Sequence, residues 1–361
     1  MIPASMENNH RKFSDFGVRS IFVEITNICN MHCVFCPTDH IQKNKGRMDF
    51  ATFSRVIDEI ASLQPVEAIS LNVLGEPLMH PDVFRFLDYC RSRKVRVYLF
   101  TNGTLTPEDV VEICKRDNIT ALVLSYQTPD AESYRLRGCR TPFEQYREGV
   151  IGVLDHVIRT KTYEKMRVEL HLANTKHLPI PGWKVLDDNA AALDVMRDLS
   201  RTIKEMYARH VVGRVDKESI EKEVEDDFKS VPENILDLRE WHYWGYRVTP
   251  KVYLRIKCLG TFGAVPEALP ESVTIVENCN EVKCEMLQQA ICIHCDGTIT
   301  NCCLDVNGEI ALGNIKSHTL LQALESERRA ASIENATIHA LCRRCLGTIT
   351  SNLPPSDQET L

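Results

Sequence analysis

The stretch RSIFVEITNICNMHCVFC, from Arg19 to Cys36, joins a run of apolar and β-branched residues directly to three cysteines. Its first eight residues are typical of a buried strand. Cys29, Cys33 and Cys36 follow at once, so the sequence predicts that they lie in the loop after that strand. Three soft thiolates in one short loop suit an iron–sulfur cluster that leaves one iron without a protein ligand.

The rest of the first half alternates predicted strands with amphipathic helices. Further strands are expected at residues 68–75, 95–100, 121–126 and 166–174. This alternation predicts an α/β fold with a parallel sheet and crossover helices, open or closed into a barrel. Ligands of such sheets bind at the C-terminal ends of the strands. Residues 248–258 could form a sixth strand, which Pro250 would confine to a sheet edge or a strand start.

The composition excludes several classes of protein. The chain has 361 residues, 43% hydrophobic and 26% charged, and its formal charge of −7 argues against a nucleic-acid partner. No apolar stretch reaches the ~20 residues that span a bilayer. The N-terminus also lacks the apolar core of a signal peptide. We therefore expect a cytoplasmic protein with no membrane partner, built as a main domain plus an appendage.

Fifteen cysteines are the anomaly in this composition. In a reducing cytosol, clustered cysteines are more often metal ligands than disulfides. Nine of them fall between Cys258 and Cys345, which indicates a second metal-binding region. Zinc is the alternative metal at both regions, although a structural zinc site needs four ligands. At the first region, His32 could supply the fourth ligand.

The spacing CxxxCxxC, with Phe35 before the last cysteine, resembles the signature of the radical S-adenosylmethionine (radical SAM) enzymes. Other segments follow in the order of that family, and Gly75-Glu76-Pro77 resembles its "GGE" motif with Leu74 in place of the first glycine. The resemblance covers roughly the first half of the chain. It implies a partial barrel and a set of residues that bind S-adenosylmethionine (SAM), which are Phe35, Gly75, Glu76, Pro77, Asn102, Ser125, Arg137, His171 and Asn174.

The roles of these residues are also carried over from the resemblance. Glu76 would bind the methionyl amino group, and Ser125 and Arg137 are candidates for the methionyl carboxylate. His171 and Asn174 would approach the ribose. A reduced 4Fe–4S cluster on the first cysteines would cleave SAM and release a 5′-deoxyadenosyl radical. An electron donor such as flavodoxin or ferredoxin is then required.

The C-terminal cysteines resemble the SPASM and shorter Twitch extensions of the same superfamily. A CxxC pair, Cys342 and Cys345, follows a Cys284–Gly297–Cys302 arrangement. The resemblance implies that these four cysteines hold one auxiliary 4Fe–4S cluster, carried by a β-hairpin around Asn307-Gly308 and a following helix. Cys303 could replace its neighbour Cys302, and a four-cysteine zinc ribbon is the structural alternative. No cysteine lies between Cys303 and Cys342, which favours the single-cluster Twitch form.

The expected domain boundaries follow from these motifs. Residues 1–17 would be an N-terminal extension and residues 18–259 the barrel, with a helical insertion at about 184–230. Residues 260–275, rich in proline, would be a linker. The auxiliary-cluster domain would occupy residues 276–350, followed by a C-terminal tail at 351–361.

The expected reaction is the oxidation of a small polar molecule, such as a sugar, aminocyclitol or nucleoside. A cluster with four protein ligands suits electron transfer, as in the Twitch enzymes of aminoglycoside biosynthesis that oxidise an aminocyclitol alcohol. Epimerisation, with Cys139 or Cys258 as hydrogen donor, and decarboxylation are alternatives. Maturation of a ribosomal peptide is another, although such enzymes often carry an N-terminal peptide-recognition domain, and Arg19 leaves little room for one. The last alternative is a degenerate fold without catalytic activity, in which the metal sites are structural. Possible pocket residues are Tyr126, Gln127 and Trp241 to Trp244.

Overall fold

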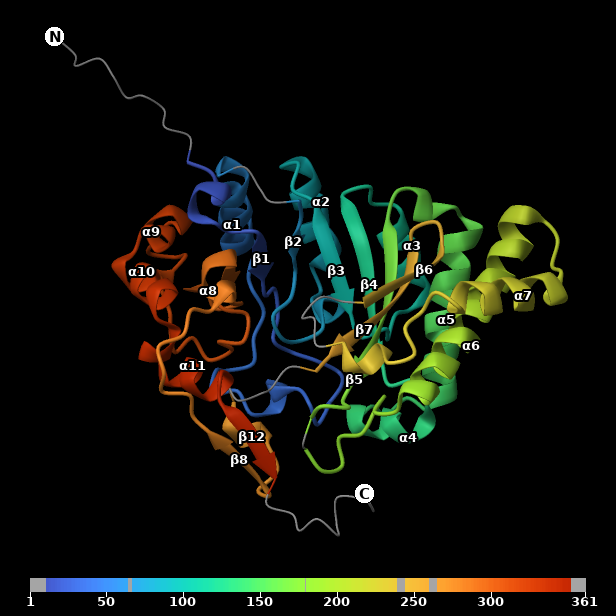
Figure 1. Ribbon diagram of the computed structural model, residues 1–361. Coiled ribbons are helices and arrows are strands. Elements are labelled where there is room, and N and C mark those ends of the chain that lie inside the picture. Colours follow the sequence, from blue (N-terminus) through green and yellow to red (C-terminus); the bar gives the residue numbers. More distant parts are fainter. Residues whose placement is uncertain (1–10, 64–66, 179, 239–243, 260–264, 352–361) are drawn as a thin grey trace.

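One mixed sheet of ten strands organises the part of the chain that the computed structural model describes, namely residues 11–63, 67–178, 180–238, 244–259 and 265–351 (Figure 1). The strand order is β11-β10-β9-β1-β2-β3-β4-β5-β7-β6. The strands are β1 (Ser20–Val23), β2 (Ile69–Ser70), β3 (Val97–Thr101), β4 (Ile119–Gln127), β5 (Arg167–Asn174), β6 (Trp244–Thr249), β7 (Val252–Cys258), β9 (Ala290–Ile293), β10 (Thr298–Thr300) and β11 (Gly313–Asn314). A separate pair, β8 (Val273–Val276) and β12 (Thr348–Ser351), is antiparallel.

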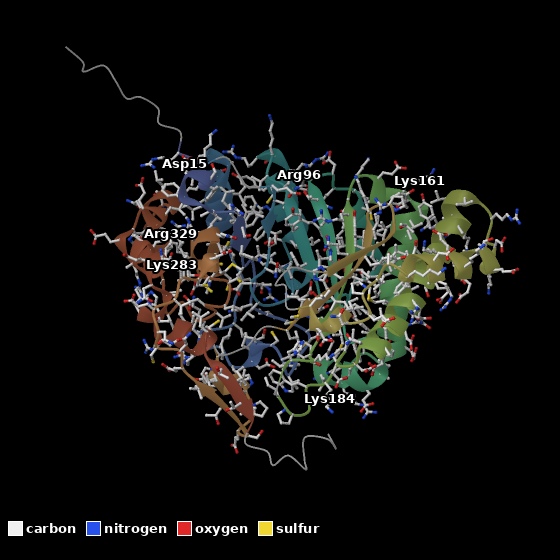
Figure 2. The ribbon with its side chains drawn as sticks, in the orientation of Figure 1. Asp15, Arg96, Lys161, Lys184, Lys283 and Arg329 are labelled. Carbon is white, nitrogen blue, oxygen red and sulfur yellow. The ribbon has the colours of Figure 1, made fainter. Side chains whose placement is uncertain are left out.

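Strands β1 to β5 and β7 are parallel, which confirms the predicted α/β sheet. One face is apolar and packs on helices, with Ile21, Leu99, Leu122, Leu170 and Leu254 in the same core. In Figure 2, Arg96 and Lys161, which precede β3 and β5, lie at the top of the molecule, and Lys184, which follows β5, lies at the bottom. The C-terminal ends of the strands therefore share the lower end.

The helices of the first half begin where their capping residues predict. Thr106 accepts a hydrogen bond from the backbone N–H of Asp109 and Pro107 occupies the first turn of α3, as expected. Asp49 caps α1 in the same way. The helices of this part are α1 (Phe50–Ser62), α2 (Val83–Ser92), α3 (Pro107–Cys114), α4 (Ala131–Tyr134), α5 (Phe143–Arg159), α6 (Asn189–Tyr207) and α7 (Lys217–Phe228). Helices α6 and α7 fall within the predicted insertion.

The strand expected at residues 248–258 is present as β7, which begins two residues after Pro250, whereas Val248 and Thr249 belong to β6. Pro250 and Lys251 form the turn between β6 and β7, and Lys251 has a φ of +60°. A turn needs no backbone N–H from Pro250, so the proline is tolerated without an edge position. Strand β7 lies inside the sheet, parallel to β5, and β6 forms the edge.

Strands β9, β10 and β11 of the C-terminal domain continue the same sheet, beside the separate pair β8–β12. Strand β9 pairs in parallel with β1, with Ile21 opposite Ile291. The predicted β-hairpin is formed by β10 and β11, and Asn307-Gly308 lies within its loop, residues 301–312, which is longer than a two-residue turn. The buried Asp305 carboxylate accepts hydrogen bonds from the N–H groups of Glu309 and Ile310, which holds these residues in a loop. The helices here are α8 (Glu285–Gln289), α9 (Leu320–Leu324), α10 (Glu327–Glu334) and α11 (Ala340–Cys345).

The predicted extensions lie partly outside the described residues. Residues 1–10, 260–264 and 352–361 are not described, and neither are Trp241, His242 and Tyr243. Phe13, within the expected N-terminal extension, is buried in the main core, so that part of the extension packs on the barrel. Strand β8 begins within the expected linker. None of the described helices has the length and apolar character needed to cross a bilayer.

Candidate active site and iron–sulfur ligands

The first three cysteines lie in the loop after β1, as predicted. The Asn27 side chain fixes the start of this loop, because it donates to the Asn44 carbonyl at 3.1 Å and accepts from the Gly46 N–H at 2.7 Å. The thiols of Cys29, Cys33 and Cys36 lie within electrostatic range of one another. Burial raises the pKa of Cys33 to about 11, so metal binding must displace its proton.

A single zinc ion at the first cysteines would require a fourth ligand. Among the described residues, no three His, Cys, Asp or Glu side chains converge on a point that could hold one metal ion. A zinc ion needs its thiolates at about 2.3 Å from one centre, whereas a 4Fe–4S cluster binds each thiolate on a separate iron. His32 does not join the cysteines, since its Nδ1 bonds Asp39 at 2.8 Å. A zinc ion at the first region would therefore need a fourth ligand other than His32.

The Gly75-Glu76 turn lies directly against the cysteine loop. The Glu76 N–H donates to the Ile28 carbonyl at 2.9 Å. Gly75 has a φ of +73°, and a Cβ there would lie 2.4 Å from the Thr26 carbonyl oxygen. Only glycine fits so close an approach. Pro77 then begins a 3₁₀ turn, Pro77–Met79, with Glu76 as its cap.

Glu76 is a buried carboxylate linked to the first cysteine through Asn102. It accepts hydrogen bonds from the N–H groups of Asn102 at 2.6 Å and Leu78 at 3.2 Å. Burial raises its pKa to about 7, although these N–H groups favour the charged form. The Asn102 amide donates to Cys29 Sγ at 3.7 Å. A carboxylate in this place can bind the ammonium group of an amino acid.

Arg137 is a fully buried guanidinium that braces the strand ends. It donates to the carbonyls of Ser125 at 2.7 Å, Tyr126 at 2.9 Å and Asn102 at 3.2 Å. Its charge also reaches Cys33. Tyr146 of α5, which sequence reasoning missed, bonds both Arg137 and the Asn102 carbonyl, at 3.0 and 2.8 Å. The Nε of Arg137 is one of several buried side-chain atoms of the described structure that have no hydrogen-bond partner of their own.

The residues predicted near the ribose lie on opposite faces of the sheet. Leu124 and Leu170 are register partners on the helix-covered face, so Ser125 and His171 share the other face. His171 bonds Glu169 at 3.0 Å, and its ring meets Phe100 edge to face. Asn174 instead donates to the Leu236 carbonyl at 2.8 Å. His171 therefore lies on the same face of the sheet as Ser125, whereas Asn174 does not.

Glu169 lies among charged side chains on the face of β5 and β7 that the helices do not cover, which we call the inner face. Burial opposes its ionisation, but His171, Arg255 and Arg167 outweigh that penalty and lower the pKa of Glu169 to about 2. Burial also lowers the pKa of His171 in spite of Glu169, so the imidazole is neutral near pH 7. The pair is thus a carboxylate bonded to a neutral ring.

The remaining candidate residues are dispersed. Phe35 packs with Ile180, Trp183 and Ile349, so β12 covers the cysteine loop. Tyr126 stacks on Tyr146 on the helix side and does not face the inner side. Cys258 accepts a hydrogen bond from Asn174 at 3.5 Å, also on the helix-covered face. Cys139 lies beside Tyr134 and Thr141; burial opposes ionisation of its thiol, but hydrogen bonds from both lower its pKa.

The structure brings the four predicted auxiliary ligands together. Cys302 and Cys342 are buried in one apolar cluster, with Cys284 packed against it. Burial raises the pKa of Cys342 to about 12, and the charges of Cys284 and Cys345 add to this shift. Cys303 is also within range of Cys284 and Cys345, so proximity alone admits either neighbour.

The auxiliary cysteines lie near the C-terminal end of the barrel. Lys257, at the end of β7, lies close enough to Cys303 to lower the pKa of that thiol, although burial dominates and raises it. The carboxylate of Glu24, just after β1, accepts hydrogen bonds from the N–H groups of Leu74 at 3.1 Å and Cys295 at 3.2 Å. Lys43, after the first cysteine loop, bonds His294 at 2.8 Å and Asp296 at 3.1 Å. These contacts, which sequence reasoning missed, fasten the two cysteine regions together.

Known proteins share both halves of this arrangement. The radical SAM superfamily model matches residues 23–163, and the iron–sulfur cluster-binding SPASM model matches residues 284–346. The AdoMet-dependent heme synthase of Methanosarcina barkeri is 34% identical over 137 residues, 37% of this chain and 38% of that protein. A Pyrococcus furiosus protein, the tungsten-containing aldehyde ferredoxin oxidoreductase cofactor-modifying protein, is 31% identical over 98 residues, 26% of this chain and 27% of its own. The chain thus matches well under half the length of these two relatives.

Solved structures are similar in fold over most of the chain. BtrN, in complex with AdoMet and 2-DOIA, gives a TM-score of 0.53 at 15% identity, covering 91% of this chain and 93% of BtrN. Streptococcus suis SuiB, bound to the precursor peptide SuiA, gives 0.55 at 17% identity, covering 88% and 66%. At these identities the likeness concerns the fold alone. The chain thus carries a radical SAM domain, followed at its C-terminal end by a SPASM-type iron–sulfur cluster-binding domain.

Proposed function

We propose that this protein cleaves SAM reductively and oxidises a small polar alcohol, such as a sugar, aminocyclitol or nucleoside, to a ketone. When bound, one 4Fe–4S cluster supplies the electron that cleaves SAM, and the auxiliary cluster accepts an electron from the substrate. The observation that carries this proposal is one apolar cluster that contains Leu74, Cys302 and Cys342 and has Cys36 packed against it, at the C-terminal ends of the strands. A second cluster there lies where parallel sheets bind their ligands.

The residues of the first site divide the remaining work. Cys29, Cys33 and Cys36 would hold the first cluster, and Glu76 the amino group of SAM. Arg137 keeps the ends of β3 and β4 in place through the Asn102 and Ser125 carbonyls. Phe35 and the apolar residues around it shield this loop from water. Cys284, Cys302, Cys342 and Cys345 would hold the auxiliary cluster.

The proposed oxidation needs a proton acceptor as well as an electron acceptor. The substrate loses a hydrogen atom from carbon to the deoxyadenosyl group, a proton from its hydroxyl oxygen, and one electron. His171 is neutral, is oriented by Glu169 and shares a face with Ser125. It is therefore the group suited to take the hydroxyl proton. An electron donor of flavodoxin or ferredoxin type and a cytoplasmic location complete the proposal.

A peptide substrate is the second candidate. SuiB, whose fold is similar, was solved with a precursor peptide, and the strand pair β8–β12 offers sheet edges that an extended chain can join. Epimerisation is less well supported, because Cys258 faces the helix side and leaves Cys139 as the described candidate donor. Decarboxylation needs a carboxylate on the substrate. It also requires the cleavage of SAM at the first site, as the oxidation does.

The test uses anaerobically reconstituted full-length protein and the variant with Ala at Cys29, Cys33 and Cys36. Two clusters predict about eight irons per chain in the wild type and about four in the variant. With dithionite, the wild type should form 5′-deoxyadenosine and the variant should not. Screening then compares deuterated alcohols with peptides, and deuterium in 5′-deoxyadenosine marks the substrate. Cleavage of SAM by the triple variant would overturn the assignment of the first site, and zinc in place of the second cluster would remove the electron acceptor.

A further inference from the structure

The loop that carries the first cysteines is bordered by an unusual concentration of cations. Residues 31–47 and 134–141 contain six Lys and Arg residues and one acidic residue, in a chain whose net charge is −7. We name these two segments the cationic collar. Its cations are Lys43, Lys45, Arg47, Arg135, Arg137 and Arg140.

Backbone hydrogen bonds hold the two segments of the collar side by side. The His32 N–H donates to the Arg137 carbonyl at 3.0 Å, and the Val34 N–H donates to the Leu136 carbonyl at 2.8 Å. Gly138 permits this approach, because it has a φ of +54° and a Cβ there would lie 2.7 Å from the His32 carbonyl oxygen. The cations of the second segment are thus fixed at the rim of the cysteine loop.

Two cations of the collar already have internal tasks. Arg137 is buried among carbonyl groups, and Lys43 bonds His294 and Asp296. Lys45, Arg47, Arg135 and Arg140 are exposed instead. Within the described structure, no ion pair involves Arg135 or Arg140. Exposed cations such as these contribute little to folding stability, so their concentration calls for another explanation.

An exposed apolar side chain lies where the two segments of the collar meet. Val34, between Cys33 and Cys36, is 41% exposed. Asp39, the one acidic residue of the collar, is bonded to His32. An exposed apolar side chain in a loop rich in cations is typical of a transient protein interface, in which the charges steer the encounter. A site for a small anion would instead need buried donors aimed at one point.

We propose that the cationic collar is the docking surface for an acidic, low-potential electron carrier of flavodoxin or ferredoxin type. The inference rests on the proposed function, because it requires a cluster on Cys29, Cys33 and Cys36. In the transfer, the carrier loses one electron and that cluster gains it. Val34 is adjacent to one ligand and two residues from another, so a carrier seated on it is separated from the cluster by little more than the cysteine loop.

The test compares two reductants in the reconstituted wild type and in the double variant Arg135→Glu/Arg140→Glu. Formation of 5′-deoxyadenosine from SAM is measured with dithionite, which needs no docking surface, and with a flavodoxin kept reduced by NADPH and its reductase. At low ionic strength, we expect the double variant to lose about tenfold or more of the flavodoxin-driven rate and to keep its dithionite-driven rate. The wild-type flavodoxin rate should fall as salt rises, whereas that of the variant should change little.

Lys217→Glu/Lys222→Glu is the matched control, because it makes the same change of charge on α7, on the far side of the molecule from the cysteine loop (Figure 1). Its flavodoxin-driven rate should stay near that of the wild type. Equal losses in both double variants, or none in the collar variant, would overturn the docking proposal. A wild type inactive even with dithionite would instead contradict the proposed function.

Discussion

Replacing Gly75 by Ala tests how closely the Gly75-Glu76 turn is fitted to the cysteine loop. The new Cβ would lie 2.4 Å from the Thr26 carbonyl oxygen and 2.9 Å from both Asn27 Cα and the Ile28 carbonyl oxygen. All three are backbone atoms, so relief requires movement of the chain that leads to Cys29. A non-glycine residue at a φ of +73° costs about 1–2 kcal/mol, and overpacking adds about 1–3 kcal/mol. We therefore expect a loss of about 2–5 kcal/mol.

The assay is urea unfolding of the anaerobic apoprotein, in which the free energy of unfolding is compared at equal m-values. Gly149→Ala is the control, because the same Cβ on α5 would meet no atom within 4 Å. In a helix this substitution should stabilise by up to about 1 kcal/mol. SAM cleavage should fall in Gly75→Ala and persist in Gly149→Ala. A Gly75→Ala protein within about 1 kcal/mol of the wild type would refute the reasoning.

Four further substitutions test the buried charges and the auxiliary ligands. Glu169→Gln should lower the free energy of unfolding by about 3 kcal/mol near pH 7, because the pKa of Glu169 is held at about 2. That stabilisation is present above the unfolded-state pKa of about 4.3, so the difference from the wild type in urea titrations should shrink as the pH falls towards 2. Glu76→Gln leaves one of two buried N–H donors facing an amide group, and SAM affinity by equilibrium dialysis should fall about 10-fold or more. Cys302→Ala should reduce iron from about eight to about four per chain, whereas Cys303→Ala should retain about eight, as measured by iron and sulfide analysis.

The parts of the fold that depend on local pattern could be predicted from the sequence. The strand at Arg19 to Thr26 and the capped helix after Thr106 both rest on neighbouring residues. The two cysteine regions were predicted because ligand spacing is local too, and the SPASM match bears out the second one. The pairing of strands that lie far apart in the sequence could not be predicted. Nothing near residue 250 indicates that β7 enters the sheet beside β5, because that choice depends on what the rest of the sheet leaves unpaired.

The inner face of the barrel was equally hard to predict. Which of His171 and Asn174 faces inward depends on strand alternation, which shifts with a single residue of register. Tyr146 carries no local signal, since its hydroxyl meets Asn102 only after α5 packs on the sheet. Glu24 did carry a local signal in the sequence, because a carboxylate inside the apolar run IFVEIT must find buried hydrogen-bond partners. The sequence could not say that one of those partners is the N–H of Cys295.

The parallel pairing of β1 with β9 has a consequence for how the chain folds during synthesis. The partner of β1 is made nearly 270 residues after it, which takes roughly 15–50 s at ~5–20 residues per second. Throughout that interval the outer edge of β1 presents unpaired N–H and C=O groups, the kind of edge on which chains aggregate. A chain that stops before Ala290 keeps this edge open permanently. Truncation to the barrel alone should therefore yield insoluble protein, and chaperones should be found on nascent chains until β9 has left the ribosome.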